Sequence, residues 1–269
     1  MKAKKVLFIT TEMTPFVPDT YRSLKARNLS QTVQEYGYEV RTFSPKWGII
    51  NERRYQLHEV IRLSGMNIII DDTDHPLLIK VASIAGTRMQ VYFIDNDEFF
   101  LRREMLTDPD GNEYADNGER SIFYVRGVLE TLKKLRWIPD VIHCHGWATS
   151  LVPLFIKKAY QNEPSFCDAK VVFSMSAPEF KQDYGKKFLD IIPFRDIKPR
   201  DYNDICTDHC TADDLTKIAA KWSDGVVCED ADVSADVIEY VKSIGKPMLE
   251  HQDENNFAEA YSEFYDSLL

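Results

Sequence analysis

The sequence has little glycine, and none of it is arranged as a phosphate-binding motif. Its 269 residues include 11 glycines, and neither G-x-G-x-x-G nor a Walker loop occurs among them. In Rossmann-type proteins the turn after the first strand supplies such glycines, whose N–H groups face the phosphates. The corresponding turn here contains Pro15, Pro18 and Asp19. A conventional dinucleotide site is therefore disfavoured, and we predict no cofactor.

Long apolar runs and an excess of basic residues are also lacking. No apolar run reaches the roughly 18 residues that a transmembrane helix needs, and the run at 6–10 is too short for a signal peptide. The 33 Lys and Arg against 43 Asp and Glu give a net charge of −10. Nucleic acid and anionic membranes are thus disfavoured as partners. Five cysteines without regular spacing predict reduced thiols and a cytoplasmic location.

One cluster of potential zinc ligands occurs at Cys206, His209 and Cys210. A structural zinc site needs further ligands at a matching spacing. The remaining candidates, His143, Cys144, His145 and Cys228, do not provide it. We predict free thiols here and no metal site.

Strand-like and helix-like segments alternate along much of the chain. Strand-like segments lie at 5–10, 39–43, 140–143, 170–174 and 225–228, and the nearly continuous apolar run at 5–10 is typical of a strand buried on both faces. Helical periodicity is found at 20–36, 119–135, 149–160, 213–222 and 233–244. This order predicts one doubly wound α/β sheet of parallel strands.

The middle of the chain departs from this alternation. Runs at 77–84 and 89–94, joined by a short turn, predict an antiparallel hairpin on the sheet edge. The polar stretch 95–117 is long for a loop, and we expect Asn117 to cap the helix that follows. Residues 181–212 show no period that predicts an element.

A short strand at 246–249 and a helix at 256–268 end the pattern. Aromatic and apolar residues in this helix recur every three or four positions, at Phe257, Tyr261, Phe264, Tyr265 and Leu268. The stripe predicts a helix that packs on the rest of the protein rather than a free tail.

The stretch from Trp137 to Trp147 (WIPDVIHCHGW) is the best candidate for a site. Pro139 stops the preceding helix, 140–143 forms the strand, and the residues after it fall at a strand's carboxyl end, where α/β proteins bind ligands. A packed strand end with one satisfied imidazole is the alternative. If Cys144 extends the strand, we expect it to face the core, with the flanking histidines pointing opposite ways.

Several segments together resemble the bacterial glycogen synthases and plant starch synthases. The opening run at 6–16 (VLFITTEMTPF) is similar to that family's first strand and its continuation. The segments at 92–100 and 114–123 (YADNGERSIF) resemble its edge strand and a helix start. The stretch 137–147 resembles its W-x-P-D-V-x-H-x-H-D-W-H signature. The resemblance covers roughly residues 4 to 175.

The resemblance implies a fold and an activity. Family members have two Rossmann-like domains with the active site between them, the GT-B arrangement. They transfer glucose from ADP-glucose to an α-1,4-glucan and retain the configuration. Residues 1–269 then correspond to the N-terminal domain alone, with 255–269 as the closing helix that packs back on it. An unrelated amphipathic terminal helix is the alternative.

The departures from the family pattern are equally informative. Where the family has Lys-Thr-Gly-Gly-Leu, which holds the nucleotide phosphates, this chain has Pro18 to Arg22 (PDTYR). The signature's Asp and final His are here Gly146 and Ala148, and the later His-Asn is Ser176-Ala177. A second, nucleotide-binding domain does not fit in the length.

These observations predict a glycogen or starch synthase-like protein that is not catalytic by itself and binds a glucan or a partner. We therefore assign no catalytic residue. The expected remnant cleft consists of Glu12, Asp116, Asn117, His145 and Trp147. The ligands implied are an α-glucan, a nucleotide sugar, or a protein in place of the missing domain. The alternative is an active glycosyltransferase completed by another chain.

The contribution of Trp147 to that cleft has two interpretations. Its ring could offer an aromatic face on which sugar C–H groups pack. Alternatively, Trp147 starts its helix buried against the sheet.

Overall fold

The computed structural model describes residues 3–102, 104–252 and 257–269. Its centre is a sheet with the strand order β10-β9-β8-β7-β1-β2-β6-β5-β3 and with β4 paired to β5. The strands from β10 to β6 in this order are parallel, and β5 pairs antiparallel with β6, β4 and β3. The strand bounds are β1 Lys5–Thr10, β2 Glu39–Pro45, β3 His58–Glu59, β4 Met66–Ile70, β5 Thr73–Ser83, β6 Gln90–Asp95, β7 Val141–His145, β8 Lys170–Met175, β9 Gly225–Cys228 and β10 Met248–Leu249.

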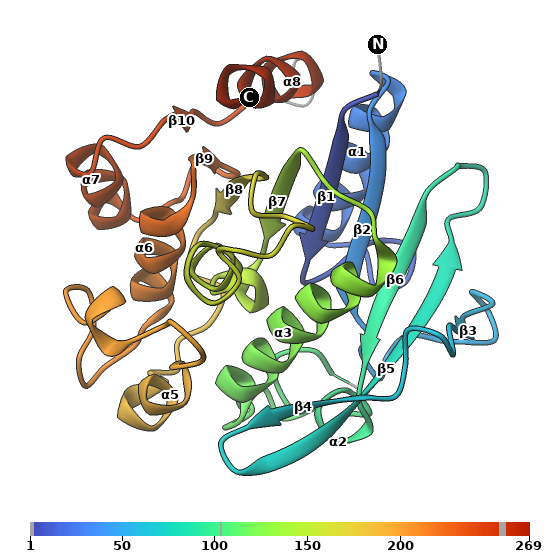
Figure 1. Ribbon diagram of the computed structural model, residues 1–269, viewed down its shortest axis with the longest axis horizontal. Coiled ribbons are helices and arrows are strands. Elements are labelled where there is room, and N and C mark those ends of the chain that lie inside the picture. Colours follow the sequence, from blue (N-terminus) through green and yellow to red (C-terminus); the bar gives the residue numbers. More distant parts are fainter. Residues whose placement is uncertain (1–2, 103, 253–256) are drawn as a thin grey trace.

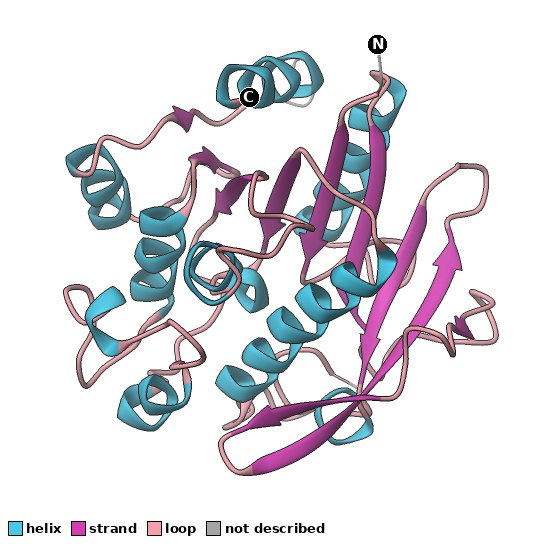
Figure 2. Ribbon diagram, viewed as in Figure 1, coloured by secondary structure: helices cyan, strands magenta, loops and turns pink. Residues whose placement is uncertain are grey.

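Helices cover both faces of this sheet (Figure 1, Figure 2). The α-helices are α1 Tyr21–Glu35, α2 Asp97–Phe100, α3 Asn117–Leu135, α4 Val152–Leu154, α5 Gly185–Ile191, α6 Ala212–Trp222, α7 Ala235–Ser243 and α8 Phe257–Leu268. Other helical turns are η1 Trp147–Thr149, η2 Phe155–Ala159 and η3 Pro199–Asp201. The helices α3, α4 and α6 pack in the larger core, whereas α1 and α8 pack in a smaller core on the opposite face. The predicted doubly wound α/β fold is confirmed.

Strand β1 shows why both faces must be covered. Leu7 and Ile9 belong to the larger core, and Val6 and Phe8 belong to the smaller one. All four side chains are buried because alternate residues of a strand point to opposite faces. The nearly continuous apolar run in the sequence is thus explained by burial on two sides.

The edge of the sheet extends beyond the prediction. The hairpin of β5 and β6 is confirmed, but β5 also pairs with β4 in a second hairpin that the sequence did not indicate. The polar stretch after β6 contains the short helix α2, capped by Asn96. Phe99 and Phe100 of this helix are buried in the larger core, so the segment packs on the domain.

Two predicted helices differ in detail. Asn117 does not cap α3: Asp116 occupies that position, and Asn117 is the first helical residue. Its buried side chain instead donates to Leu106 O over 2.9 Å and accepts from Arg120 over 2.6 Å. The segment 149–160 is divided among η1, α4 and η2. Pro153 lacks the N–H that a continuous helix would need there.

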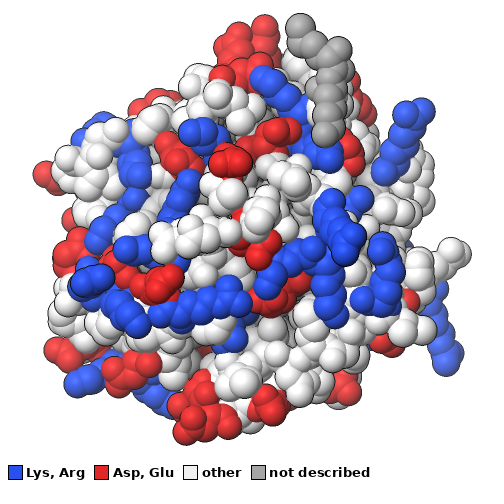
Figure 3. Space-filling view, viewed as in Figure 1, with Lys and Arg blue, Asp and Glu red and all other residues white. Residues whose placement is uncertain are grey.

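On the face that carries α3, basic and acidic side chains are interspersed (Figure 3). The net charge of −10 is therefore not displayed there as a continuous acidic surface. No helix in the described ranges is long and apolar enough to cross a membrane.

Helix α8 packs back on the sheet, as predicted. Phe257, Tyr261 and Tyr265 are buried in the smaller core. The hydroxyl of Tyr265 and Nδ1 of His143 share a hydrogen bond of 2.5 Å. Asp266 pairs with Lys4 near the start of β1 at 2.7 Å. The helix therefore covers the centre of the sheet.

The hydrogen bond and the packing of Tyr265 allow a test of how much α8 contributes to the stability of the fold. We expect Tyr265→Ala to destabilise the fold by about 3–5 kcal/mol through lost packing. Tyr265→Phe keeps the ring but leaves His143 Nδ1 unpaired, at a cost of about 1–3 kcal/mol. Urea unfolding measures both. Equal stability of Tyr265→Ala and wild type would show that α8 is dispensable.

Candidate functional site

Four side chains meet beyond the carboxyl ends of four neighbouring strands. Glu12 follows β1, His145 ends β7, Glu179 follows β8 and Glu229 follows β9. The three carboxyls are close enough to repel one another, and Nδ1 of His145 lies 3.6 Å from Oε2 of Glu229. We call Glu12, Glu179 and Glu229 the carboxylate cluster.

The start of α1 closes over this cluster through three consecutive residues. Thr20, the N-cap of α1, donates to Glu12 over 2.8 Å. The Tyr21 hydroxyl donates to the Glu229 carbonyl over 3.0 Å. Arg22 donates to Ala177 O over 3.3 Å, and its Nε lies 3.6 Å from Glu179. Residues 20–22 therefore connect three strand ends. In the sequence they stood out only because they differ from the family's Lys-Thr-Gly-Gly-Leu stretch.

Burial raises the pKa of two of these carboxyls, Glu12 and Glu179. It raises the pKa of Glu12, while the hydrogen bond from Thr20 and the charge of Arg22 act against it. Burial also raises the pKa of Glu179 to about 7, opposed by Arg22 and by the Trp147 N–H but supported by Glu12 and Glu229. The sequence analysis did not include Glu179 in the site, because nothing in the segment 176–180 (SAPEF) indicates that this carboxyl is buried.

The two histidines of the signature lie on the same face, so the expectation that they point opposite ways was wrong. Their rings are 4.1 Å apart, because residues two apart on a strand share a face. Cys144 points to the larger core as expected, and burial raises the pKa of its thiol. A neutral, buried thiol is a poor nucleophile.

The histidines differ in their partners. His143 is fully satisfied by Tyr265 and by Ser174, whose hydroxyl lies 3.0 Å from Nε2. Burial lowers the pKa of His143 well below its usual range, which keeps it neutral. His145 is equally buried, but neither of its ring nitrogens makes a hydrogen bond within the described residues.

Gly146 connects β7 to η1 in a conformation that excludes side chains. Its φ of 84° and ψ of 163° lie in a region that is essentially restricted to glycine. A Cβ would also lie 2.5 Å from Thr11 Oγ1. Thr11 is held in place, because its carbonyl accepts from Trp47 Nε1 over 2.7 Å.

Trp147 is buried, which favours the second of its two interpretations. Its ring packs at 6.3 Å from the Trp47 ring and at 6.4 Å from the Phe180 ring. Only 6% of the residue is exposed, so the indole offers little face to a sugar.

Asp116 and Asn117 have partners in the loop that precedes α3. Both oxygens of Asp116 accept from Arg102, at 2.5 and 2.6 Å, and Asn117 holds the preceding loop through Leu106. No hydrogen bond or ion pair joins either residue to Glu12 or His145 in the part of the chain that is described. The structure thus gives Asp116 and Asn117 partners in the loop before α3, and the grouping of Glu12, Asp116, Asn117, His145 and Trp147 in one cleft stays a prediction.

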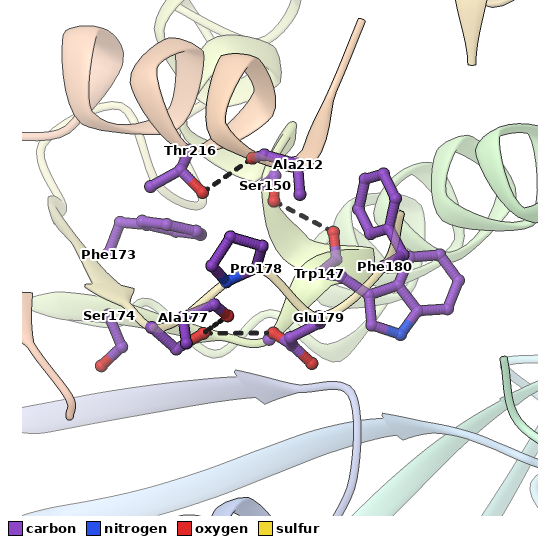
Figure 4. Close-up of a pocket in the computed structure, with 12 residues that line it drawn as sticks. Trp147, Ser150, Phe173, Ser174, Ala177, Pro178, Glu179, Phe180, Ala212 and Thr216 are labelled. Atoms are coloured by element: carbon purple, nitrogen blue, oxygen red, sulfur yellow. Dashed lines mark hydrogen bonds between the residues drawn. The ribbon is translucent and has the colours of Figure 1, made fainter. Parts of the chain in front are cut away.

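A small hollow adjoins Glu179 (Figure 4). It is bounded by the turn at Gly146, the segment after β8, and Ala212 and Thr216 of α6. Pro178 lies between Phe173 and Glu179 in this view. The cavity volume of about 20 Å³ is sufficient for about one water molecule, so a sugar ring does not fit inside.

The candidate zinc ligands are arranged for packing. Cys206 and Cys210 are buried free thiols, whereas His209 is exposed and pairs with Asp183 at 2.5 Å. Over residues 3–102, 104–252 and 257–269, no group of three or more His, Cys, Asp or Glu side chains is placed to hold a metal ion.

The raised pKa of Glu179 predicts a pH-dependent stability. The folded protein binds this proton more tightly than the unfolded chain, so ionisation of Glu179 destabilises the fold as pH rises from about 4.5 through about 7. By pH 8 the cost is about 3 kcal/mol. Glu179→Gln should be more stable than wild type at pH 8 by up to that amount and equal to it near pH 4, measured by urea unfolding. Asp232→Asn, an exposed site, is the control; a parallel shift in both variants would contradict the assignment.

A second test concerns the steric restriction at Gly146, and Gly86, whose backbone angle is similar, serves as the control. Gly86 has a similar φ of 77°, but a Cβ at that position would meet nothing within 4 Å. Gly146→Ala should therefore cost more than Gly86→Ala, which bears only the backbone strain of about 1–3 kcal/mol. Thermal unfolding of both variants gives the difference. Equal losses of thermal stability in the two variants would show that the Thr11 side chain moves away from the new methyl group.

Comparison with known proteins gives a consistent result. The family model described as "Starch synthase catalytic domain" matches residues 5–239. A glycogen synthase of Pelodictyon phaeoclathratiforme is 32% identical over 215 residues, which are 80% of this chain and 42% of that protein. One of Chlorobium phaeobacteroides is 38% identical over 172 residues, 64% of this chain and 35% of that protein. This chain thus spans less than half the length of these curated relatives.

A solved structure shows the same fold. It is the catalytic domain of Starch Synthase IV from Arabidopsis thaliana bound to ADP and acarbose. The TM-score is 0.77 at 19% identity, over 94% of this chain and 52% of that one. The sheet order, the signature stretch and the match over residues 5–239 lead to one conclusion: this chain belongs to the starch synthase catalytic domain family.

Proposed function

We propose that this chain is a non-catalytic member of its family, a pseudoenzyme of glucan metabolism that binds a glucan or a protein partner. The observation that carries the proposal is the charge at the strand ends. Three carboxyls lie at neighbouring strand ends, Glu229 is 3.6 Å from His145, and the nearby Arg22 is paired with Glu179. Glycosyl transfer from a nucleotide sugar needs cations and N–H donors on the departing diphosphate.

The arrangement opposes such a leaving group. The side chains of Glu12 and Glu229 add negative charge where a diphosphate would develop more of it, and like charges repel strongly at low dielectric. Loss of one stabilising donor typically costs about 3–4 kcal/mol in the transition state. Residues 20–22, in the segment that replaces the family's phosphate-binding stretch, are engaged in holding the strand ends.

The space beside the cluster supports the same proposal. The hollow at Glu179 measures about 20 Å³, too little for a sugar ring. We propose that residues 1–269 act as one unit in the cytoplasm, closed by the helix at 255–269. A glucan would then contact the surface around the remnant cleft of Glu12, Asp116, Asn117, His145 and Trp147 rather than enter it.

The second candidate is a glycosyltransferase completed by another chain. It is favoured by the comparison with the Arabidopsis structure, where this chain covers 52% of its counterpart. A protein that supplied the remaining part would face the same strand ends. It would have to displace or neutralise the carboxylate cluster to accept a nucleotide sugar.

The test is a glucosyl-transfer assay with ADP-glucose or UDP-glucose and glycogen, beside a glycogen pull-down. The isolated chain should show no turnover and should be retained on glycogen if it is a glucan-binding module. The Pelodictyon glycogen synthase is the positive control. Turnover above background that is lost in His145→Ala would contradict the proposal, and retention without turnover would support it.

A further inference from the structure

A basic groove lies beside the last turn of α3. This turn and the loop before β4 form its walls, and its volume is about 730 Å³. Four cations and one carboxylate line it, and these are Arg62, Lys133, Lys134, Arg136 and Glu130. Figure 3 shows basic side chains gathered over the end of α3. In a chain with a net charge of −10, this part of the surface has the opposite sign.

Three of the four cations are not neutralised within the protein. Lys133 pairs with Glu130 at 2.8 Å. Among the described residues, Arg62, Lys134 and Arg136 form no ion pair, and Lys134 only donates to a backbone carbonyl over 3.5 Å. The helix dipole favours cations in the last turn of a helix, which accounts for Lys133 and Lys134. It does not account for Arg62, because that residue lies on a different segment.

Arg136 has a backbone conformation that favours glycine. It caps α3 with a φ of 49°, in the left-handed region where helices commonly end on glycine. A residue with a Cβ is disfavoured there, so the fold alone gives no reason for a long side chain. The arginine lines the basic groove and also borders a second hollow, together with Lys5 and Ile138.

Apolar side chains accompany these cations. In the groove Leu63 is buried, while Met66 and Leu135 are half-buried. Two isoleucines close in sequence to the cations face solvent, since Ile61 is 83% exposed and Ile138 is 54% exposed. Exposed apolar residues beside polar ones are typical of surfaces that bind other proteins.

The groove is not built to enclose a small anion. Sites for small ligands bury most of the ligand and direct a few fixed polar groups at it. Here Arg62, Lys134 and Arg136 are exposed. No lining residue has a buried, unpartnered polar atom in the part of the chain that the structure describes. Exposed cations around apolar side chains instead resemble the rim of a protein interface, where charges select and steer the partner.

We propose that the basic groove docks an acidic, amphipathic segment of a partner protein. Its carboxylates pair with the three cations that lack a partner, and its apolar side chains cover Leu63 and Met66. The inference goes beyond the proposed function. Arg136 precedes β7, at the amino ends of the strands, whereas the carboxylate cluster lies beyond their carboxyl ends. A segment bound in the groove therefore leaves that end of the sheet free.

Substitutions on the two walls of the groove test the proposal. Arg62→Glu reverses a charge on the loop, and Arg136→Gly removes one while giving the backbone the residue that its φ favours. Each should weaken binding of an acidic segment severalfold, and the two together should abolish it. Thermal unfolding of Arg136→Gly should match wild type, so that weaker binding is not caused by unfolding.

Lys186→Glu is the matched control. It makes the same charge reversal as Arg62→Glu at an exposed position of α5. This helix packs through Phe188 on Gly118, which lies at the other end of α3. The substitution should leave the affinity for acidic segments unchanged.

Fluorescence anisotropy of labelled peptides, titrated with the full chain, measures these affinities. The probes are short peptides that carry glutamate and leucine in several orders, and the same peptides with glutamine in place of glutamate. We expect the glutamate peptides to bind, less tightly as ionic strength rises, and the glutamine peptides to bind much more weakly. Pyrophosphate is the small-anion probe. Retention on glycogen should not differ between wild type and the groove variants.

Other outcomes would overturn the docking proposal. Equal binding of the glutamine and glutamate peptides would leave the cations without a role, as would glutamate binding that neither groove variant weakens. Pyrophosphate binding without peptide binding would assign the groove to a small anion. The absence of any probe binding to folded wild type would show that the groove has no acidic partner. Loss of glycogen retention in wild type would affect only the proposed function.

Discussion

The constraint on which this structure depends is the burial of its central strands on both faces. A parallel sheet of this kind buries both of its faces, so the central strands must be covered twice. On one side α3, α4 and α6 lie close to the strands they follow. On the other side the cover comes from α1 and α8, which are separated by most of the chain. This double cover holds the strands in their order, and the order places the ends of neighbouring strands side by side.

That cover also explains why these strand ends converge whether or not a ligand is bound. The strand ends β1, β7, β8 and β9 are adjacent because of the hydrogen-bonded sheet order, not because of any ligand. Residues 20–22 connect three of these strand ends through hydrogen bonds within the protein. The carboxyls of Glu12, Glu179 and Glu229 follow three of the strands, and Glu229 lies 3.6 Å from His145.

Much of the fold was predictable because it depends on local periodicity and short turns. The strands at 5–10 and 170–174 and the helix α6 are read directly from apolar runs. The hairpin of β4 and β5 was missed because its pattern is partly exposed, with Ile69 facing solvent. Asn117 was assigned as a cap because its side chain suits one. In the fold, Leu106 and Arg120 offer it buried partners instead.

The site was less predictable, because its members come from segments that no motif connects. Glu12 and His145 were selected through the resemblance to the family, whereas Glu179 and Glu229 follow strands whose ends carry no pattern. Only the pairing of β8 and β9 in the sheet brings their carboxyls to the same place. Asp116 was expected in the cleft, and the structure pairs it with Arg102, a residue fourteen positions earlier that no motif connects to it.

The contact between α8 and His143 also has a consequence for synthesis on the ribosome. The strands β1, β7 and β8 can pair as soon as residue 175 has emerged, and α1 is available by then. The other half of the cover on that face comes from residues 257–268, which are made later. The emerging chain therefore carries an apolar sheet face, with His143 at its centre, until translation of α8 is complete. During that interval it offers chaperones a binding surface that the finished protein does not have.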